Sequence, residues 1–317
     1  MRTSKPQIGV SACLIGRKVR FDGGHKHNRY ITSLFSDHVD LLPVCPEIEL
    51  GLGVPRPTIQ LRLQGQDVRL VVSKDPSQDL TDSMKSYADR RVGALCDLDG
   101  FIFKKDSPSC GLFRVPVVIN EQGYKNKKGT GLFAQAFVKK YPLIPVEEEG
   151  RLNDPALREN FFERVYAYHR WKAIEKPETN VQGLIEFHAR HKLMLMARGS
   201  SYYQELGRII SGVTRKDLMQ RRDEYIHRFM EIMSINTRRG RQVNVMQHIL
   251  GYLKQMLSKE DKKELLSVFE AYRRQQMPLI TPLTLLQHHL RKHPHPYINS
   301  QHYLQPYPEQ LALRSTL

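Results

Sequence analysis

Three cysteines lie in short segments whose residue types suit metal binding. Cys13 lies in SACLIG, Cys45 in VCPE and Cys110 in SPSCG. Small residues and proline favour turns, so each thiol could face a shared pocket. Thiolates select soft metals and iron–sulfur clusters, and three thiolates without a fourth leave one iron of a 4Fe–4S cluster open to substrate. The spacing alone also allows a second interpretation, in which all three are core cysteines.

The fourth cysteine, Cys96, is flanked by Leu95 and Leu98 near the end of a predicted helix. We interpret it as a buried, inert thiol outside the metal site. Four separated cysteines are not the density of a secreted disulfide scaffold, and the residues after Met1 lack the apolar run of a signal peptide. These features predict a cytoplasmic protein.

The three cysteine segments resemble the bacterial thiouracil desulfidase (TudS) family, whose signature is the same SACLxG, CPE and SPSCG set. The similarity also includes residues 20–23 (RFDG) and 51–57 (GLGVPRP), and it spans about residues 7–145. The resemblance implies a 4Fe–4S cluster held by Cys13, Cys45 and Cys110. Its open iron would take the sulfur of a thiolated pyrimidine, which leaves as sulfide.

The same resemblance implies catalytic roles for Glu47 and Ser107. Glu47 would act as general base on a water that attacks the ring carbon, and Ser107 would donate or relay a proton. The alternative is structural: Glu47 bonds backbone and Ser107 caps a turn. Asp22, followed by Gly23, is a further candidate for the pocket, although aspartate before glycine is commonly a turn former.

Alternating apolar runs and helical patterns predict the elements that position these segments. We expect strands at residues 8–13, 41–45, 101–103 and 143–146, and helices at 81–95 and 131–141. The alternation predicts a Rossmann-like α/β domain with a mainly parallel sheet. The three cysteines then follow strand ends, where open α/β sheets place their ligands. The acidic run 147–149 and residues 153–155 mark the expected junction, giving domains at 1–150 and 151–317.

The second half changes character and predicts an all-α domain. Amphipathic helical patterns occupy residues 161–171, 181–195, 202–210, 225–235, 243–256 and 259–274. Six prolines between residues 278 and 308 predict an extended C-terminal segment. Segments 187–196, 239–254 and 300–313 resemble the YbgA-like helical domain, a similarity that spans about residues 160–314.

The chain carries a formal net charge of +16, and most of this excess lies in residues 151–317. Such an excess favours a polyanionic partner, although a solvated basic surface is the alternative. Candidate RNA contacts are the basic side chains of two predicted helices, namely His188, Arg190, Lys192, Arg238, Arg239 and Arg241. The pairs His188 with His191 and His288 with His289 are more simply surface or capping histidines than metal ligands.

Proteins that join these two domains resemble desulfidases of thiolated tRNA, which return 4-thiouridine to uridine. The sequence therefore predicts tRNA and a thiolated pyrimidine as partners, and no membrane association. Three alternatives stay open. The enzyme could act on free 2- or 4-thiouracil, with the helical domain serving oligomerisation. The chain could be a non-catalytic, cluster-containing nucleic-acid-binding or redox-sensing protein. The cysteines could also hold a structural zinc ion.

Overall fold

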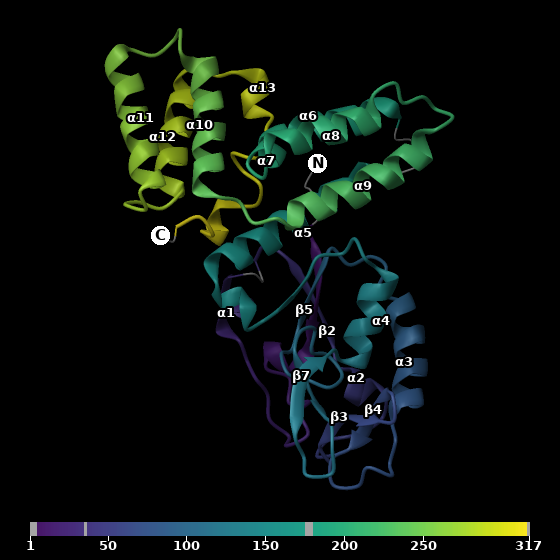
Figure 1. The fold of residues 1–317 in the computed structure, drawn as a ribbon. Coiled ribbons are helices and arrows are strands. Elements are labelled where there is room, and N and C mark those ends of the chain that lie inside the picture. Colours follow the sequence, from purple (N-terminus) through teal and green to yellow (C-terminus); the bar gives the residue numbers. More distant parts are fainter. Residues whose placement is uncertain (1–4, 35–36, 175–179, 316–317) are drawn as a thin grey trace. The chain divides into compact units, whose positions relative to one another are not determined.

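The computed structural model describes residues 5–34, 37–174 and 180–315. The chain divides into two compact units, Met1–Asp154 and Pro155–Leu317. The first unit combines strands and helices, whereas the second is helical (Figure 1). Both predicted fold classes are therefore confirmed. Each unit is described by itself below.

A four-stranded parallel sheet forms the centre of the N-terminal unit. Its strands are β1 (Gln7–Ser11), β2 (Asp40–Val44), β5 (Gly100–Phe103) and β8 (Val146–Glu148), in the order β2-β1-β5-β8. Val10 of β1 pairs with Pro43 of β2 and Ile102 of β5. Because every neighbouring pair is parallel, the carboxyl ends of the strands meet at one edge of the sheet. This edge carries the cysteine segments.

Helices α3 (Thr81–Gly93) and α4 (Leu132–Lys140) lie side by side in this unit (Figure 1). Phe137 of α4 packs on Phe101 of β5 with ring centroids 5.0 Å apart, and Phe101 stacks on Phe103 at 4.1 Å. Gly9 of β1 makes room for this aromatic core, because a Cβ there would lie 2.4 Å from the Phe101 ring. The apolar face of α4 thus fixes the central strands.

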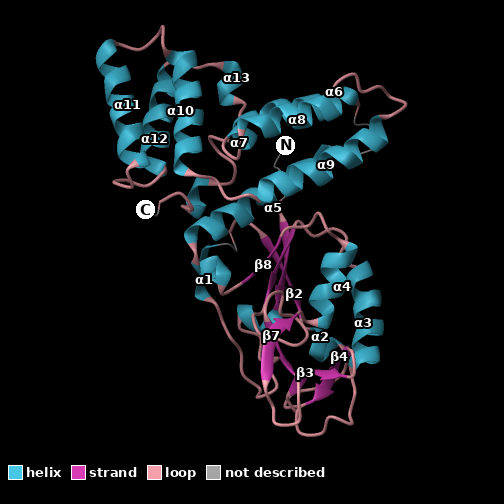
Figure 2. Ribbon diagram, in the orientation of Figure 1, coloured by secondary structure: helices cyan, strands magenta, loops and turns pink. Residues whose placement is uncertain are grey.

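A second sheet, drawn with the other strands in magenta in Figure 2, was not expected from the sequence. It comprises β3 (Ile59–Gln64), β4 (Asp67–Val72), β6 (Val115–Val118) and β7 (Lys125–Gly129), in the order β4-β3-β6-β7. β3 pairs antiparallel with β4 and parallel with β6, and β6 pairs antiparallel with β7. Short elements complete the unit: η1 (Ala12–Ile15), α1 (Arg29–Leu34), α2 (Pro46–Glu49) and η2 (Arg151–Asn153).

The predicted junction runs from the acidic residues 147–149 to residues 153–155, and the boundary between the two units falls at its end, after Asp154. The acidic residues themselves are part of the N-terminal unit. They belong largely to β8, which lies later than the strand expected at 143–146. Glu147 and Glu148 are buried there because each carboxylate has polar partners. Glu147 accepts from Arg151 Nε at 2.7 Å, and Glu148 accepts from two backbone N–H groups. Buried carboxylates with such partners are compatible with a core strand.

The helices of the C-terminal unit follow the predicted patterns with two corrections. They are α5 (Pro155–Ile174), α6 (Val181–Arg190), α7 (Lys192–Met196), α8 (Ser200–Ile210), α9 (Leu218–Ser234), α10 (Arg239–Leu253), α11 (Lys259–Arg273), α12 (Ile280–Lys292), α13 (Pro296–Asn299) and η3 (Glu309–Leu311). The pattern at 181–195 breaks into two helices at His191. The segment expected to be extended contains α12, because Pro282 lies in the first turn, where its missing N–H needs no partner.

The core of this unit combines aromatic rings with a buried ionic group. Trp171 stacks on Tyr225 with centroids 5.8 Å apart. Glu163 lies between Arg198 (2.6 Å) and Arg314 (3.0 Å), and all three side chains are almost fully buried. The ionic group therefore joins α5 to a segment near the end of the chain. Within the described residues, no helix is both long and apolar enough to cross a membrane.

Candidate active site

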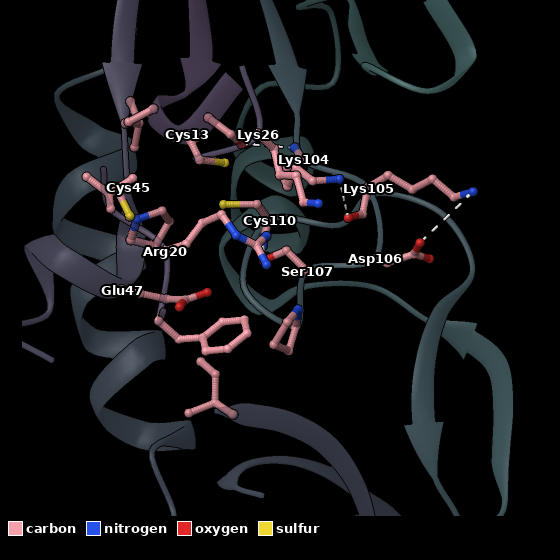
Figure 3. Close-up of a pocket in the computed structure, with 18 of the residues that line it drawn as sticks. Cys13, Arg20, Lys26, Cys45, Glu47, Lys104, Lys105, Asp106, Ser107 and Cys110 are labelled. Carbon is pink, nitrogen blue, oxygen red and sulfur yellow. Dashed lines mark hydrogen bonds and ion pairs between the residues drawn. The ribbon is translucent and has the colours of Figure 1, made fainter. Parts of the chain in front are cut away.

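A cavity of about 380 Å³ lies at the carboxyl edge of the parallel sheet, and Cys13, Cys45 and Cys110 all line it (Figure 3). Cys13 follows β1 in the short helix η1, and Cys45 follows β2 as the N-cap of α2. Cys110 lies in the loop after β5. The predicted grouping of the three cysteines at strand ends is thus confirmed. All four cysteines of the chain are free thiols.

Local geometry holds each ligand segment in place. The carbonyl of Cys13 accepts hydrogen bonds from the N–H groups of Gly16 (3.4 Å) and Lys26 (3.0 Å). Gly16 has φ +88°, a left-handed conformation that glycine adopts without the strain of a side chain. The Cys45 N–H donates to Glu49 Oε1 at 3.1 Å, which ties the cysteine to its own helix.

The SPSCG loop is fixed from inside and from α4. Ser107 Oγ accepts from the N–H groups of Ser109 (3.3 Å) and Cys110 (3.0 Å). A Cβ at Gly111 would lie 2.4 Å from Val115, and one at Gly131 would lie 2.5 Å from the Ser109 backbone. Both glycines are therefore required by close packing. Ser107 caps a turn, as the structural interpretation held, and it also lines the cavity.

The three thiols influence one another electrostatically. Burial raises the pKa of Cys13 to about 11, which nearby Lys104 opposes. Burial likewise raises the pKa of Cys45 and of Cys110, and the other two cysteines raise the pKa of Cys110 further. Three thiolates in this cavity would need a soft cation to compensate their charge. Within the described residues no three His, Cys, Asp or Glu side chains are grouped tightly enough for a single metal ion.

Both oxygens of Glu47 are held by side chains that the sequence analysis did not single out. Arg56 Nε and Nη2 donate to Oε2 at 3.0 and 2.5 Å, and Ser109 Oγ donates to Oε1 at 3.1 Å. Arg56 is itself fixed by the carbonyls of Gly53 (2.9 Å) and Val19 (3.0 Å). Glu47 is therefore a positioned carboxylate at the cavity wall. Arg56 could have been found, since it lies within the GLGVPRP segment.

Further cations and one aromatic ring line the same cavity. Arg20, Lys26 and Lys104 contribute positive charge, and Lys104 Nζ is bonded by Glu149. Phe21 is 38% exposed, and its ring lies 5.2 Å from the Arg20 guanidinium. A half-exposed ring beside cations suits a planar, electron-rich base. Arg20 and Phe21 lie in the RFDG segment but were given no role from the sequence, whereas Lys26 and Lys104 lie outside every motif named for the family.

Comparison with known proteins assigns both units. Residues 8–149 match a family model described as 2-thiouracil desulfurase, and residues 192–308 match one described as protein of unknown function DUF1722. Residues 8–149 are thus similar to the 2-thiouracil desulfurase family, and this part of the chain is called the desulfurase domain below. The match covers almost all of the N-terminal unit, including every cavity residue named above.

Two individual proteins are similar to parts of the chain. The uncharacterized protein YbgA of Escherichia coli (strain K12) is 24% identical over 152 residues, which is 48% of this chain and 90% of YbgA. A solved structure described as the 4Fe–4S-dependent thiouracil desulfidase TudS is 28% identical. It covers 49% of this chain and 98% of its own, with a TM-score of 0.39.

Two predictions about the desulfurase domain are wrong. Asp22 does not line the cavity: its Oδ1 accepts from the Gly24 N–H at 3.0 Å, so it forms a turn on the exposed surface. Cys96 is exposed rather than buried. It lies beyond the end of α3, where the turn directs the thiol outward despite its leucine neighbours. Its exclusion from the ligand set agrees with the cavity lining.

The basic candidates of the helical unit divide into buried and exposed groups. His188 is buried: its ring stacks 4.4 Å from Tyr203, its Nδ1 lies 3.1 Å from Tyr225 Oη, and burial lowers its pKa to about 4. His191 is fully buried as well. The prediction of His188 as an RNA contact is therefore wrong, and neither histidine is a surface residue. His191 is a capping residue, as the alternative held, because it ends α6 and precedes α7. Lys192 is half-buried over the rings of Tyr203 and Tyr297.

The arginines at the start of α10 are also partly engaged inside the unit. Arg239 Nη1 donates to the carbonyl of Tyr272 at 3.0 Å, and Arg241 donates to the carbonyl of Arg198. Arg238 is exposed at the N-cap, and Arg190 is about half exposed beside Glu186. Helix α10 begins at Arg239, four residues before the start of the predicted pattern at residue 243. Two of the six candidates, Arg190 and Arg238, keep guanidinium groups that a polyanion could reach.

Proposed function

We propose that this protein is a 4Fe–4S-dependent desulfidase that converts 4-thiouridine in tRNA to uridine without net electron transfer. The observation that carries the proposal is the grouping of three thiols, a positioned carboxylate and a serine around one cavity of the desulfurase domain.

The donor set fits a cluster with one open iron. Cys13, Cys45 and Cys110 are three thiols with no fourth cysteine in the cavity, and Lys104 and Arg20 oppose their accumulated negative charge. A bound cluster would supply a Lewis-acidic iron that polarises the C=S bond and accepts the leaving sulfur.

The remaining chemistry belongs to side chains of the chain. Glu47 would hold the water that attacks the ring carbon and take its proton, because its carboxylate is fixed at the cavity wall by Arg56 and Ser109. Ser107 Oγ already accepts two backbone N–H bonds, so its own hydrogen is free to be donated toward the substrate. The exposed ring of Phe21 would stack on the pyrimidine.

The tRNA part of the proposal depends on charge and on the second domain. A free base needs only the small cavity, whereas a large basic excess suits the phosphates of RNA. Arg190 and Arg238 are exposed on the helical unit and are candidate phosphate contacts. We expect the target nucleotide to be taken out of its stack to reach the cavity.

The test is anaerobic purification, reconstitution with iron and sulfide, and incubation with bulk tRNA that contains 4-thiouridine. The readouts are loss of that nucleoside and release of sulfide. Cys110→Ala should abolish both, whereas the matched variant Cys96→Ala should retain them because Cys96 is exposed outside the cavity. Turnover of free thiouracil but not of tRNA would support the desulfidation chemistry and would rule out tRNA as the substrate. A stable cluster without turnover of any thiolated base would favour a sensor, and a colourless zinc-loaded protein would favour a structural ion.

A further inference from the structure

A second cavity of about 610 Å³ lies in the same desulfurase domain and shares Lys105 with the cysteine cavity. Its lining includes five basic side chains: Lys105, Arg114, Lys127, Lys128 and Arg151. Figure 3 shows Lys105 extending away from the three cysteines. Gly150 leaves space for this lysine, because a Cβ there would lie 3.3 Å from Lys105 Cδ. The two cavities are therefore adjacent along one lysine side chain.

Two carboxylates near this second cavity are engaged within the domain, and a third, Asp106, has its Oδ2 4.0 Å from Lys105 Nζ. Glu148 is buried, and its Oε1 accepts from the N–H groups of Leu112 (2.8 Å) and Phe113 (3.0 Å). Burial raises the pKa of Glu148, and the two backbone N–H groups oppose this shift. Glu147 is paired with Arg151 at 2.7 Å. Arg114, Lys127 and Lys128 are exposed, so the mouth of the cavity keeps a positive character.

An aromatic ring stands among these cations. Phe113 is 42% exposed, and the Arg151 guanidinium lies 5.0 Å from its ring centroid. The backbone of Phe113 is fixed by Glu148, and the next residue, Arg114, has the left-handed φ of +53°. The position of the ring at the surface is thus fixed by the hydrogen bond between the Phe113 backbone and the buried Glu148 carboxylate. A fixed exposed ring surrounded by cations is the combination that binds single-stranded nucleic acid.

We propose that this second cavity binds the nucleotide adjacent to the thionucleotide in an RNA substrate. The neighbouring base stacks on Phe113, and Lys105, Lys127 and Lys128 bind the phosphodiester that joins the two nucleotides. This inference rests on the proposed desulfidation of RNA, and it gives the desulfurase domain its own share of RNA recognition. The substrate class that it selects is an oligonucleotide rather than a free base or a mononucleotide.

The test compares two substrates with the reconstituted full-length protein. One is 4-thiouridine 5′-monophosphate, and the other is a trinucleotide with 4-thiouridine in the centre. For the unaltered protein we expect kcat/KM to be about tenfold or more higher for the trinucleotide, as one base–aromatic stack and its phosphates would provide. In Phe113→Leu this ratio should fall toward one.

Lysine variants give an independent measurement. Lys128→Ala should lower the same ratio and weaken its dependence on salt, whereas Lys125→Ala should not. Both lysines are exposed on β7, but only Lys128 lines the cavity. Cluster absorbance and thermal unfolding show that each variant is folded.

Two outcomes overturn the inference. An unchanged ratio in both Phe113→Leu and Lys128→Ala means that the second cavity takes no part, although RNA desulfidation itself still stands. A protein that desulfidates free thiouracil but neither nucleotide substrate removes the proposed function and this inference together. The activity of the unaltered protein on the two nucleotide substrates therefore tells which of the two failures has occurred.

Discussion

Replacing Glu47 with glutamine tests the central chemical role in the cysteine cavity. The amide keeps the size of the side chain and an oxygen that can accept a hydrogen bond from Ser109. In the unaltered protein Ser109 Oγ lies 3.1 Å from Glu47 Oε1. The substitution removes the negative charge and the ability to take a proton. Because a positioned general base contributes about 10²- to 10⁴-fold, we expect kcat to fall by that factor.

The same substitution also has a cost in stability. The Arg56 side chain is only 3% exposed and would lose its anionic partner. Breaking a buried ion pair costs about 3–5 kcal/mol, and the lower end applies because Arg56 keeps the carbonyls of Gly53 and Val19. About 3 kcal/mol corresponds to a fall in Tm of roughly 6–12 °C for a domain of this size.

The assay must therefore separate chemistry from folding. Desulfidation of a thiolated base is followed by loss of the substrate and by sulfide release, well below the Tm of the variant. Iron content and visible absorbance report the cluster in the same sample. Glu121→Gln is the control, because Glu121 is exposed and lies outside the cavity lining.

Two results would refute the reasoning. Activity within about threefold of the unaltered protein, with a full cluster, would show that Glu47 serves only to hold Arg56. Activity that falls strictly in proportion to cluster content would show that the substitution acts through folding. A large loss of kcat with the cluster intact is the expected outcome.

Three further predictions concern the ligand loop and the helical unit. Gly111→Ala places a Cβ 2.4 Å from Val115, so we expect a loss of about 1–3 kcal/mol and lower iron retention, measured by thermal unfolding and iron analysis. Arg314→Met leaves Glu163 and Glu159 short of a buried partner and should cost about 3–5 kcal/mol in chemical denaturation, whereas loss of under 1 kcal/mol would contradict the buried network. Burial lowers the pKa of His188 from 6.5 to about 4, so its share of stability is complete above pH 6.5 and is lost as the pH falls toward 4. His188→Phe should reduce the dependence of unfolding free energy on pH in that window by up to about 1.4 kcal/mol per pH unit, whereas His227→Phe, at an exposed site, should not.

The candidate site was largely predictable where its signals are local. Each cysteine lies in a turn-forming segment directly after a strand of the parallel sheet or in the loop that follows one, and parallel strands bring such segments to one edge. The family resemblance singled out Glu47 and Ser107, which lie in the same segments, and both line the cavity. Arg56 was not, since its partnership with Glu47 depends on the path of the chain between them. Asp22 was wrongly included because an aspartate–glycine turn has the same sequence pattern whether it lines a cavity or lies on the exposed surface.

Burial was the property that sequence patterns predicted least well. Cys96 has apolar neighbours and is exposed, whereas Glu148 lies in an acidic run and is buried. His188 lies in a basic segment but packs on Tyr203 inside the helical unit. In each case the outcome depends on which distant side chains supply contacts or hydrogen bonds. The second sheet was missed because its strands are short and partly exposed, and because β3 pairs with β6 from a distant part of the chain.

The sequence by itself determined the two fold classes and the order of most helices, because periodicity acts over a few residues. The choice of Cys13, Cys45 and Cys110 as cluster ligands came from the family resemblance, and the structure places all three thiols at one cavity. Only the tertiary structure decided that Arg56 holds Glu47, that Arg20, Lys104 and Phe21 join the cysteines, and that Phe113 stands exposed in a basic cavity. These contacts are made between residues far apart in the chain, so they stabilise the site only after folding has brought those residues together.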